Sequence, residues 1–204
     1  MILTPQQAAF NKAQADARSE TVADAIRRAV PDGGDLVVLD YGSGPGHIGL
    51  RLASHFKRVI MADPDAAALA VASEAARGMP NVSTYVLGAG DVGLTDLRAD
   101  VVVSSLAWHH VRDLDTLLDT LPVVAPGGLL LVADMDADGG AYHVEIPDFD
   151  GVNGFDRAEL CGRLVKHGYT DVTIQDLFHG QKWLAGRLTD LSLFMLQARI
   201  PSAT

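Results

Sequence analysis

The sequence predicts an α/β fold built on a doubly wound, mostly parallel sheet. Short apolar runs alternate with helical stretches between residues 36 and 135, which is the order of elements in a parallel sheet with crossover helices. The runs consist of β-branched residues and leucine without polar alternation, as is typical of strands buried on both faces. With 204 residues, 48% of them hydrophobic, the chain can bury one large core, so we expect a single domain.

The first predicted element is an alanine-rich helix over residues 5–30, ended by Pro31. Strands and helices then alternate. The predicted strands cover 36–41, 58–63, 82–87, 100–106 and 128–135, and the predicted helices cover 46–56, 65–77 and 113–121.

The last third of the chain has a different pattern. A helix is predicted from Asp156, where Asp156 and Glu159 form a capping box, to the C-terminal glycine Gly168. The segments "YTDVTIQDLF" and "LSLFMLQARI" predict two strands separated by a turn around "HGQKWLAGR", hence an antiparallel hairpin at the sheet edge. Residues 136–154 have no periodicity, and loops of this length in compact domains are commonly functional.

Three parts of the single domain 1–204 follow from this order. Residues 1–31 form an N-terminal helical cap, residues 32–135 a ligand-binding core, and residues 136–204 a substrate-side loop, a helix and the C-terminal strands. We expect the loop 136–154 and the N-terminal helix to cover the substrate, because both flank the carboxyl edge of the sheet.

Charge and composition exclude several classes of partner. The chain has 26 acidic and 16 basic residues, a net charge of −10, which repels phosphate backbones, so nucleic acid is not expected as a partner. No apolar run approaches the length of a membrane span, and the N-terminus becomes polar too soon for a signal peptide. The single cysteine, Cys161, can form no internal disulfide. A cytoplasmic protein acting on a small molecule is expected, and its oligomeric state stays open.

The stretch "VVLDYGSGPGHIGL" places Gly42, Gly44 and Gly46 directly after the first predicted strand. Glycine tolerates positive φ and lets a ligand approach the main chain, and this turn is the usual ligand site of open parallel sheets. The dinucleotide fingerprint has a glycine at its sixth position, where this chain has His47. The departure suggests a ligand that needs backbone contact without a diphosphate, such as an adenosyl amino acid.

Four motifs in order resemble those of class I S-adenosylmethionine-dependent methyltransferases, of the small-molecule type related to the quinone-biosynthesis enzymes. They are "VVLDYGSGPG", "VIMADPD", "ADVVVSSLAWHH" and "VVAPGGLLLVADM", and the tail "FDRAELCGRLVKHGYTDVTI" resembles the family's closing helix and strand. The resemblance implies a Rossmann-like, seven-stranded sheet with an antiparallel last strand. It also implies S-adenosylmethionine as cofactor and in-line methyl transfer to a small-molecule acceptor.

The resemblance assigns roles residue by residue. Asp63 matches the carboxylate that binds the ribose hydroxyls, Asp91 matches the acid that receives the adenine amino group beside the Val92 amide, and Asp40 matches the acid that organises the loop and the methionyl ammonium. The full set of expected cofactor-binding residues is Asp40, Gly42, Ser43, Gly44, Gly46, Asp63, Pro64, Asp91, Val92, Ser105 and Leu106. Alternatively, Asp63 only caps the helix that begins at "DPD", with Pro64 in its first turn.

His110 and His143 are the candidate general bases. Histidine titrates near neutral pH, His109 and His110 follow the fourth strand beside the expected methyl donor, and His143 lies in the loop 136–154. Alternatively, these histidines only line the pocket and alignment alone drives transfer. No metal is implied, because neither a cysteine cluster nor the carboxylate spacing of the catechol type is present.

Two other function classes stay open. One is a binding module that holds S-adenosylmethionine or its demethylated product without catalysis. The other is an NAD-dependent oxidoreductase on the same sheet, although His47 breaks the fingerprint and no Tyr-x-x-x-Lys pair is visible. The nature of the acceptor, and whether N, O or C is methylated, is not determined by the sequence.

Overall fold

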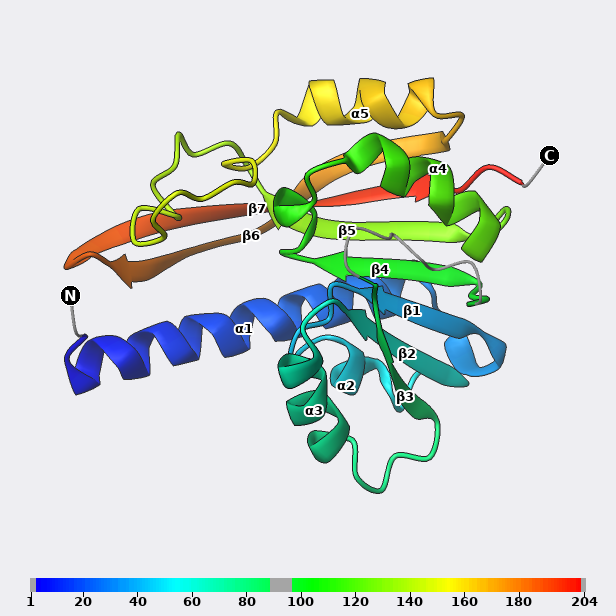
Figure 1. Ribbon diagram of the computed structural model, residues 1–204, viewed down its shortest axis with the longest axis horizontal. Helices are drawn as coiled ribbons and strands as arrows, with labels where there is room; N and C mark the ends of the chain where they lie inside the picture. The colour runs from blue at the N-terminus through cyan, green and yellow to red at the C-terminus, as the bar shows by residue number, and fades with distance from the viewer. Residues whose placement is uncertain (1–2, 89–96, 203–204) are drawn as a thin grey trace.

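The computed structural model describes residues 3–88 and 97–202. Within these ranges the chain forms one seven-stranded sheet in the order β3-β2-β1-β4-β5-β7-β6 (Figure 1). The strands are β1 (Val37–Tyr41), β2 (Arg58–Asp63), β3 (Val82–Val86), β4 (Val101–Ser105), β5 (Leu129–Met135), β6 (Thr170–Leu184) and β7 (Arg187–Arg199). Strands β1 to β5 pair in parallel, and β7 pairs antiparallel with both β5 and β6. The predicted fold class and the antiparallel last strand are therefore confirmed.

Helices cover both faces of the sheet (Figure 1). They are α1 (Pro5–Ala29), α2 (Gly49–Leu52), α3 (Ala66–Ala75), α4 (Leu114–Val124) and α5 (Arg157–Lys166), with short 3-10 turns η1 (Gly33–Asp35) and η2 (Trp108–His110). Alternate residues of each central strand enter different cores. Val102 packs with residues of α4 and α5, whereas Val101 and Val103 pack with residues of α1, α2 and α3. This double burial explains why the strands are continuously apolar.

The helix α1 has two halves with different neighbours. Its C-terminal half buries Val22, Ala23 and Ile26 against the sheet. Its N-terminal half extends alongside β6 (Figure 1). There the side-chain amide of Asn11 donates a hydrogen bond of 3.0 Å to the carbonyl of Trp183 and accepts one of 2.8 Å from the amide of Trp183. Helix α1 and the hairpin β6–β7 thus project together beyond the carboxyl end of the sheet.

Two predicted elements have different bounds in the structure. The helix expected over 46–56 is reduced to α2, because Gly46 has a φ of +87° and cannot continue a right-handed helix. The turn expected around "HGQKWLAGR" lies within that segment but is shorter, since β6 continues to Leu184 and pairs with Arg187. Only Ala185 and Gly186 form the turn, with φ of +48° and +76°, as a two-residue hairpin turn of type I′ requires.

The expected ends of α5 are present. The side chain of Asp156 accepts a hydrogen bond of 2.9 Å from the Glu159 amide, so it caps the helix. Gly168 has a φ of +82° directly after it, the conformation of a C-terminal glycine. Among the residues that the structure describes, no helix is long and apolar enough to cross a membrane.

Candidate active site

The glycine turn after β1 is fixed to the end of β2 by main-chain hydrogen bonds. The amides of Gly42 and Ser43 both donate to the carbonyl of Ala62, at 2.8 and 3.1 Å. Gly42, Gly44 and Gly46 all have positive φ, of +73°, +51° and +87°. Residues with a Cβ rarely adopt this conformation, so the bare backbone predicted at this turn is confirmed.

The three glycines face different surroundings. A Cβ on Gly42 would lie 2.3 Å from the Cβ of Ala107, and a Cβ on Gly46 would lie 2.9 Å from the Sδ of Met61. These two glycines are required by packing within the protein. A Cβ on Gly44 would meet no described atom within 4 Å. Gly44 therefore exposes its backbone to open space at the carboxyl ends of β1 and β2.

Asp63 lies beside this open backbone at the end of β2. Its Oδ2 accepts a hydrogen bond of 2.7 Å from the Gly44 amide, and its Oδ1 accepts one of 2.8 Å from the Asp65 amide. The alternative that Asp63 caps the following helix is wrong, because Asp65 caps α3 by accepting from the amides of Ala67 and Ala68. Pro64 precedes that cap. Each carboxylate oxygen of Asp63 has a second acceptor site for a ligand hydroxyl.

Asp40 is buried beneath the turn. Its side chain is 1% exposed, and Oδ2 accepts a hydrogen bond of 2.8 Å from the amide of Gly49 at the start of α2. Burial raises the pKa of Asp40 to about 7, and the negative charge of Asp63 acts in the same direction. A buried carboxyl group with a raised pKa beside a ligand turn is a typical functional-site feature.

Ser43 provides a test of whether this turn accepts a polar ligand. Its hydroxyl is buried and has no hydrogen-bond partner among the described residues. An unpaired buried hydroxyl costs free energy unless a ligand or water completes it. Together with the open Gly44 and the carboxylates of Asp40 and Asp63, it fits a ligand that carries hydroxyl and ammonium groups, as an adenosyl amino acid does.

The end of β4 forms the opposite side of the turn. Leu106 has a φ of +54°, and its amide donates a hydrogen bond of 2.8 Å to the carbonyl of Ala133 in β5. Non-glycine residues in this region are strained, and such strain gathers at ligand sites. Ser105 ends β4 and is half-buried. Asp91 and Val92, expected to bind the adenine, lie outside the described residues.

The imidazole of His109 is hydrogen-bonded to a buried carboxylate. Its Nδ1–H donates to Oδ1 of Asp134 at 2.7 Å, and both side chains are almost fully buried. Asp134 also accepts from the amides of Trp108 and Met135, at 3.0 and 2.8 Å. These bonds fix the imidazole and leave Nε2 pointing away from Asp134. Trp108 is 1% exposed and packs in the core.

The loop 136–154 packs on η2 and brings His143 to His109. The Val152 amide donates to the carbonyl of His109 at 2.8 Å. The ring of His143 stacks on Phe149 at 3.8 Å, and its Nδ1–H faces Oδ1 of Asn153 at 3.1 Å. The ring centroids of His143 and His109 lie 5.1 Å apart.

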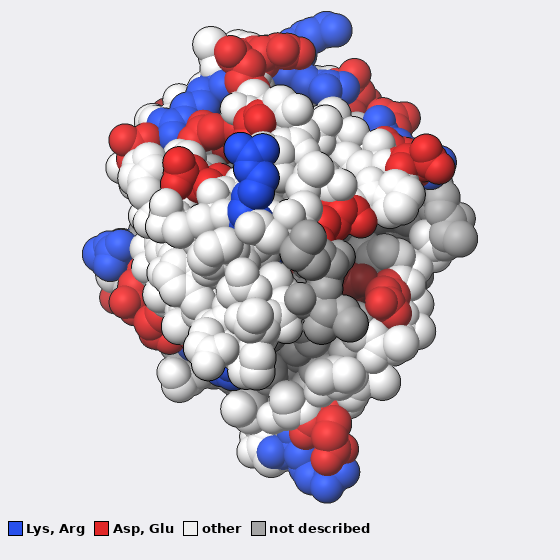
Figure 2. Space-filling model, turned by 90° about the vertical axis from the view of Figure 1, so that its left-hand side faces the viewer, with Lys and Arg blue, Asp and Glu red and all other residues white. Residues whose placement is uncertain are grey.

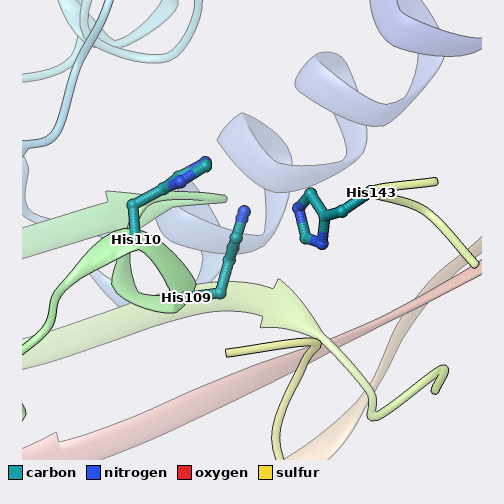
Figure 3. A group of neighbouring side chains, drawn as sticks. All are labelled: His109, His110 and His143. Carbon is teal, nitrogen blue, oxygen red and sulfur yellow. The ribbon is translucent and has the colours of Figure 1, made fainter. Parts of the chain in front are cut away.

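His110 completes a group of three histidines, which we call the histidine cluster (His109, His110 and His143; Figure 3). His110 is exposed, and its ring centroid lies 4.2 Å from that of His109 and 6.0 Å from that of His143. Partial burial lowers the pKa of His110, and its neighbours His109 and His143 lower it further. The structure therefore brings together the two candidate bases that the sequence selected.

Sequence reasoning missed the partners that orient the cluster. In the sequence, Asp134 lies in the predicted strand 128–135, and Phe149 and Asn153 lie in the aperiodic segment 136–154, where no pattern assigns them a role. The available signal was Asp134 itself, a charged residue inside the otherwise apolar run "LLLVADM", because a buried charge needs a partner.

The fold and this site define a class of protein. Residues 38–128 match the family described as "Methyltransferase domain". This part of the chain belongs to that family, and its fold is that of the class I S-adenosylmethionine-dependent methyltransferases.

Particular relatives agree with this class. An uncharacterized methyltransferase of Schizosaccharomyces pombe is 30% identical over 156 residues, which cover 70% of this chain and 51% of the relative. The ubiquinone/menaquinone biosynthesis C-methyltransferase of Rubrivivax gelatinosus is 31% identical over 107 residues, covering 52% of this chain and 41% of the relative. This chain thus spans about half the length, or less, of these relatives.

A solved structure shares the fold. The crystal structure of magnesium protoporphyrin IX methyltransferase from Synechocystis, with bound S-adenosylhomocysteine (SAH), matches with a TM-score of 0.66 at 15% identity, covering 98% of this chain and 89% of that one. S-adenosylhomocysteine is the demethylated form of S-adenosylmethionine, and the open turn at Gly44 fits a ligand of this kind.

Proposed function

We propose that this chain transfers a methyl group from S-adenosylmethionine to a small-molecule acceptor. The observation that carries the proposal is the open main chain of Gly44 hydrogen-bonded to the carboxylate of Asp63, at the carboxyl ends of β1 and β2. Asp63 would accept the ribose hydroxyls, Asp40 would face the methionyl ammonium, and Ser105 and Leu106 would flank the methionine. Asp91 and Val92 would receive the adenine.

The cofactor supplies an activated methyl group on a sulfonium. Transfer from a sulfonium is an in-line displacement, so the main task of the protein is to hold the acceptor in line with the methyl group. Alignment alone corresponds to about 7–11 kcal/mol of the barrier. The rigid turn at Gly42 and Gly46, packed against Ala107 and Met61, is suited to such positioning.

The acceptor would lie between the glycine turn and the loop 136–154. Helix α1 and the hairpin β6–β7 extend past this end of the sheet and would form the outer walls. On the face viewed in Figure 2, acidic and basic side chains are interspersed and do not form a broad basic area. With the net charge of −10, this supports a small acceptor and argues against nucleic acid.

The histidine cluster would activate the acceptor. A base contributes a factor of about 10² to 10⁴ when the acceptor atom carries a proton of high pKa. His110 and His143 are the candidates, because they come from η2 and from the loop 136–154, between which the acceptor would lie.

Turnover to S-adenosylhomocysteine tests the proposal. The purified chain is incubated with S-adenosylmethionine and fractions of a small-metabolite library, and product is measured by mass spectrometry. Acceptor-dependent formation of S-adenosylhomocysteine is expected. Binding of S-adenosylmethionine without turnover in any fraction would instead favour the non-catalytic binding module, and binding of NAD(H) alone the oxidoreductase.

A further inference from the structure

The histidine cluster has the composition of a metal site. One potential ligand nitrogen from each of His109, His110 and His143 lies within 4.8 Å of the other two. Two of the residues are adjacent in η2, and the third comes from the loop after β5, so separate elements converge on one point (Figure 3). In Figure 3 the ring of His109 lies between those of His110 and His143.

Two of the three imidazoles are oriented as metal ligands are. The Nδ1–H of His109 donates to the buried carboxylate of Asp134, and the Nδ1–H of His143 faces the amide oxygen of Asn153. Metal-bound histidines typically donate their second nitrogen to a carboxylate or another oxygen acceptor, which fixes the tautomer and strengthens the ligand. In both residues this leaves Nε2 as the available ligand atom.

Stacking further restricts one of these rings. The ring of His143 lies on Phe149 at 3.8 Å with an interplanar angle of 10°.

In a tetrahedral zinc site, with Zn–N distances of about 2.0–2.1 Å, the ligand nitrogens lie about 3.3 Å apart. The ligand nitrogens of the cluster therefore have to approach one another by up to about 1.5 Å, and the exposed side chain of His110 can turn inward.

We propose that His109, His110 and His143 bind one divalent transition-metal ion of the zinc type. Imidazole ligands suit zinc, copper, iron and nickel, whereas magnesium and calcium prefer oxygen ligands. Three protein ligands leave a fourth position open, which is the arrangement of catalytic rather than structural zinc sites. The buried carboxylate of Asp134 beneath His109 offsets part of the ion's charge.

At this location the ion would have a chemical role in methyl transfer, and that role rests on the proposed function. The cluster lies directly after β4, whose end contacts the glycine turn through Ala107 and Gly42. An acceptor hydroxyl or thiol placed at the open position would lose its proton more easily, because a bound cation lowers the pKa of a coordinated group. The ion would then replace a histidine base as the activating group, and acceptors with a hydroxyl or thiol would be preferred.

This proposal departs from the expectation that no metal binds. That expectation considered cysteine clusters and carboxylate spacing only, and not histidines brought together from η2 and the loop 136–154.

A zinc titration tests the proposal. The full chain is stripped of metal with a chelator, and zinc is added in competition with a chromophoric chelator while melting curves monitor the fold. We expect one zinc ion per chain and an affinity about 100-fold or more lower for His109→Ala, His110→Ala and His143→Ala. Asn153→Ala, which removes only the orienting acceptor, should lower the affinity by about 10 to 100-fold.

His179→Ala is the matched control, because His179 is an exposed histidine on β6 outside the cluster, and it should bind zinc like the parent. If the parent binds less than one zinc ion, or if the His110→Ala variant binds as tightly as the parent, the metal site is rejected. His110 is exposed, so this variant decides the question even if His109→Ala fails to fold.

The titration is independent of methyl transfer. Methyl transfer without zinc binding would reject the metal site alone and return the cluster to the role of a base. Zinc binding without methyl transfer to any acceptor would reject the proposed function alone.

Discussion

The amide of Gly44 donates a hydrogen bond of 2.7 Å to Oδ2 of Asp63, and this bond joins the turn after β1 to the end of β2. The carboxylate of Asp63 therefore helps to hold the shape of the glycine turn. Each carboxylate oxygen of Asp63 keeps a second acceptor site, and a Cβ on the neighbouring Gly44 would meet no described atom within 4 Å. The turn and the carboxylate act as one unit, and both should respond when either is changed.

Alanine at Gly44 and at Gly46 should have different effects. Both substitutions place a Cβ at positive φ, at a cost of about 1–2 kcal/mol. The new Cβ of Gly46→Ala also collides with Met61 and Ala72. The free energy of unfolding of this variant should therefore fall by about 1–3 kcal/mol more. The new Cβ of Gly44→Ala meets no described atom. This variant should bind S-adenosylhomocysteine about tenfold or more weakly, because the new methyl group would occupy space that the ligand needs.

Chemical denaturation and calorimetry on the two variants check this contrast. Equal losses of stability, with unchanged affinity for Gly44→Ala, would mean that no ligand approaches the turn at Gly44.

Asp40 should make the stability of the chain depend on pH. Its native pKa of about 7 lies above the value of about 3.9 expected in the unfolded chain. Between these values the native state binds more protons than the unfolded state, so the contribution of Asp40 to stability falls as the pH rises from about 4 to about 7. Above about pH 7 the buried charge is a constant penalty.

Asp40→Asn removes this penalty and keeps an oxygen that can accept from the Gly49 amide. Measured by denaturation, the variant should gain stability relative to the parent as the pH is raised from 5 to 8, and the gain should level off above about pH 7. It should also bind S-adenosylmethionine more weakly, because the carboxylate that would face the ammonium is lost. A difference between variant and parent that does not change with pH would contradict the raised pKa.

His110→Ala and His143→Ala should lower kcat by about 10² or more and leave cofactor affinity near that of the parent. The cluster would act on the acceptor, whether as a base or through a metal ion, and the cofactor contacts come from β1, β2 and β4. Steady-state kinetics with an identified acceptor, together with S-adenosylhomocysteine titrations, measure both quantities. Rates within a few-fold of the parent for both variants would assign catalysis to alignment alone.

The sheet was predictable because its signal is local. Runs such as "VVVSS" in β4 are buried on both faces, and such strands are apolar throughout. The cap at Asp156 and the turn at Gly168 were predictable for the same reason, since each depends on a few neighbouring residues. The Gly44 turn could be read from spacing alone.

The elements that were missed depend on distant contacts or on backbone conformation. Helix α2 is short because Gly46 has a φ of +87°, which a right-handed helix does not allow. The hairpin pairs β6 with β7 as far as Leu184, and Asn11 of α1 hydrogen-bonds to Trp183 near its end. The orientation of His109 requires Asp134, which is 25 residues away in the chain. Sequence periodicity carries no information on such pairs.

The central claim is that S-adenosylmethionine binds at Gly44 and Asp63, and Asp65 offers a matched control for it. Asp65 is an aspartate two residues further on whose described role is to cap α3. Asp65→Ala should lose about 1 kcal/mol of stability and keep its affinity for the cofactor. The control thus separates loss of a cap from loss of a ligand contact.

The most direct measurement is a calorimetric titration of S-adenosylhomocysteine into the parent chain, Asp63→Ala and Asp65→Ala. Each hydrogen bond to a charged group contributes about 1.5–3 kcal/mol, so Asp63→Ala should weaken binding by about 10 to 10³-fold, while Asp65→Ala binds like the parent. Parent-like affinity in Asp63→Ala, or no binding by the parent chain itself, would contradict the assignment of the glycine turn as the cofactor site.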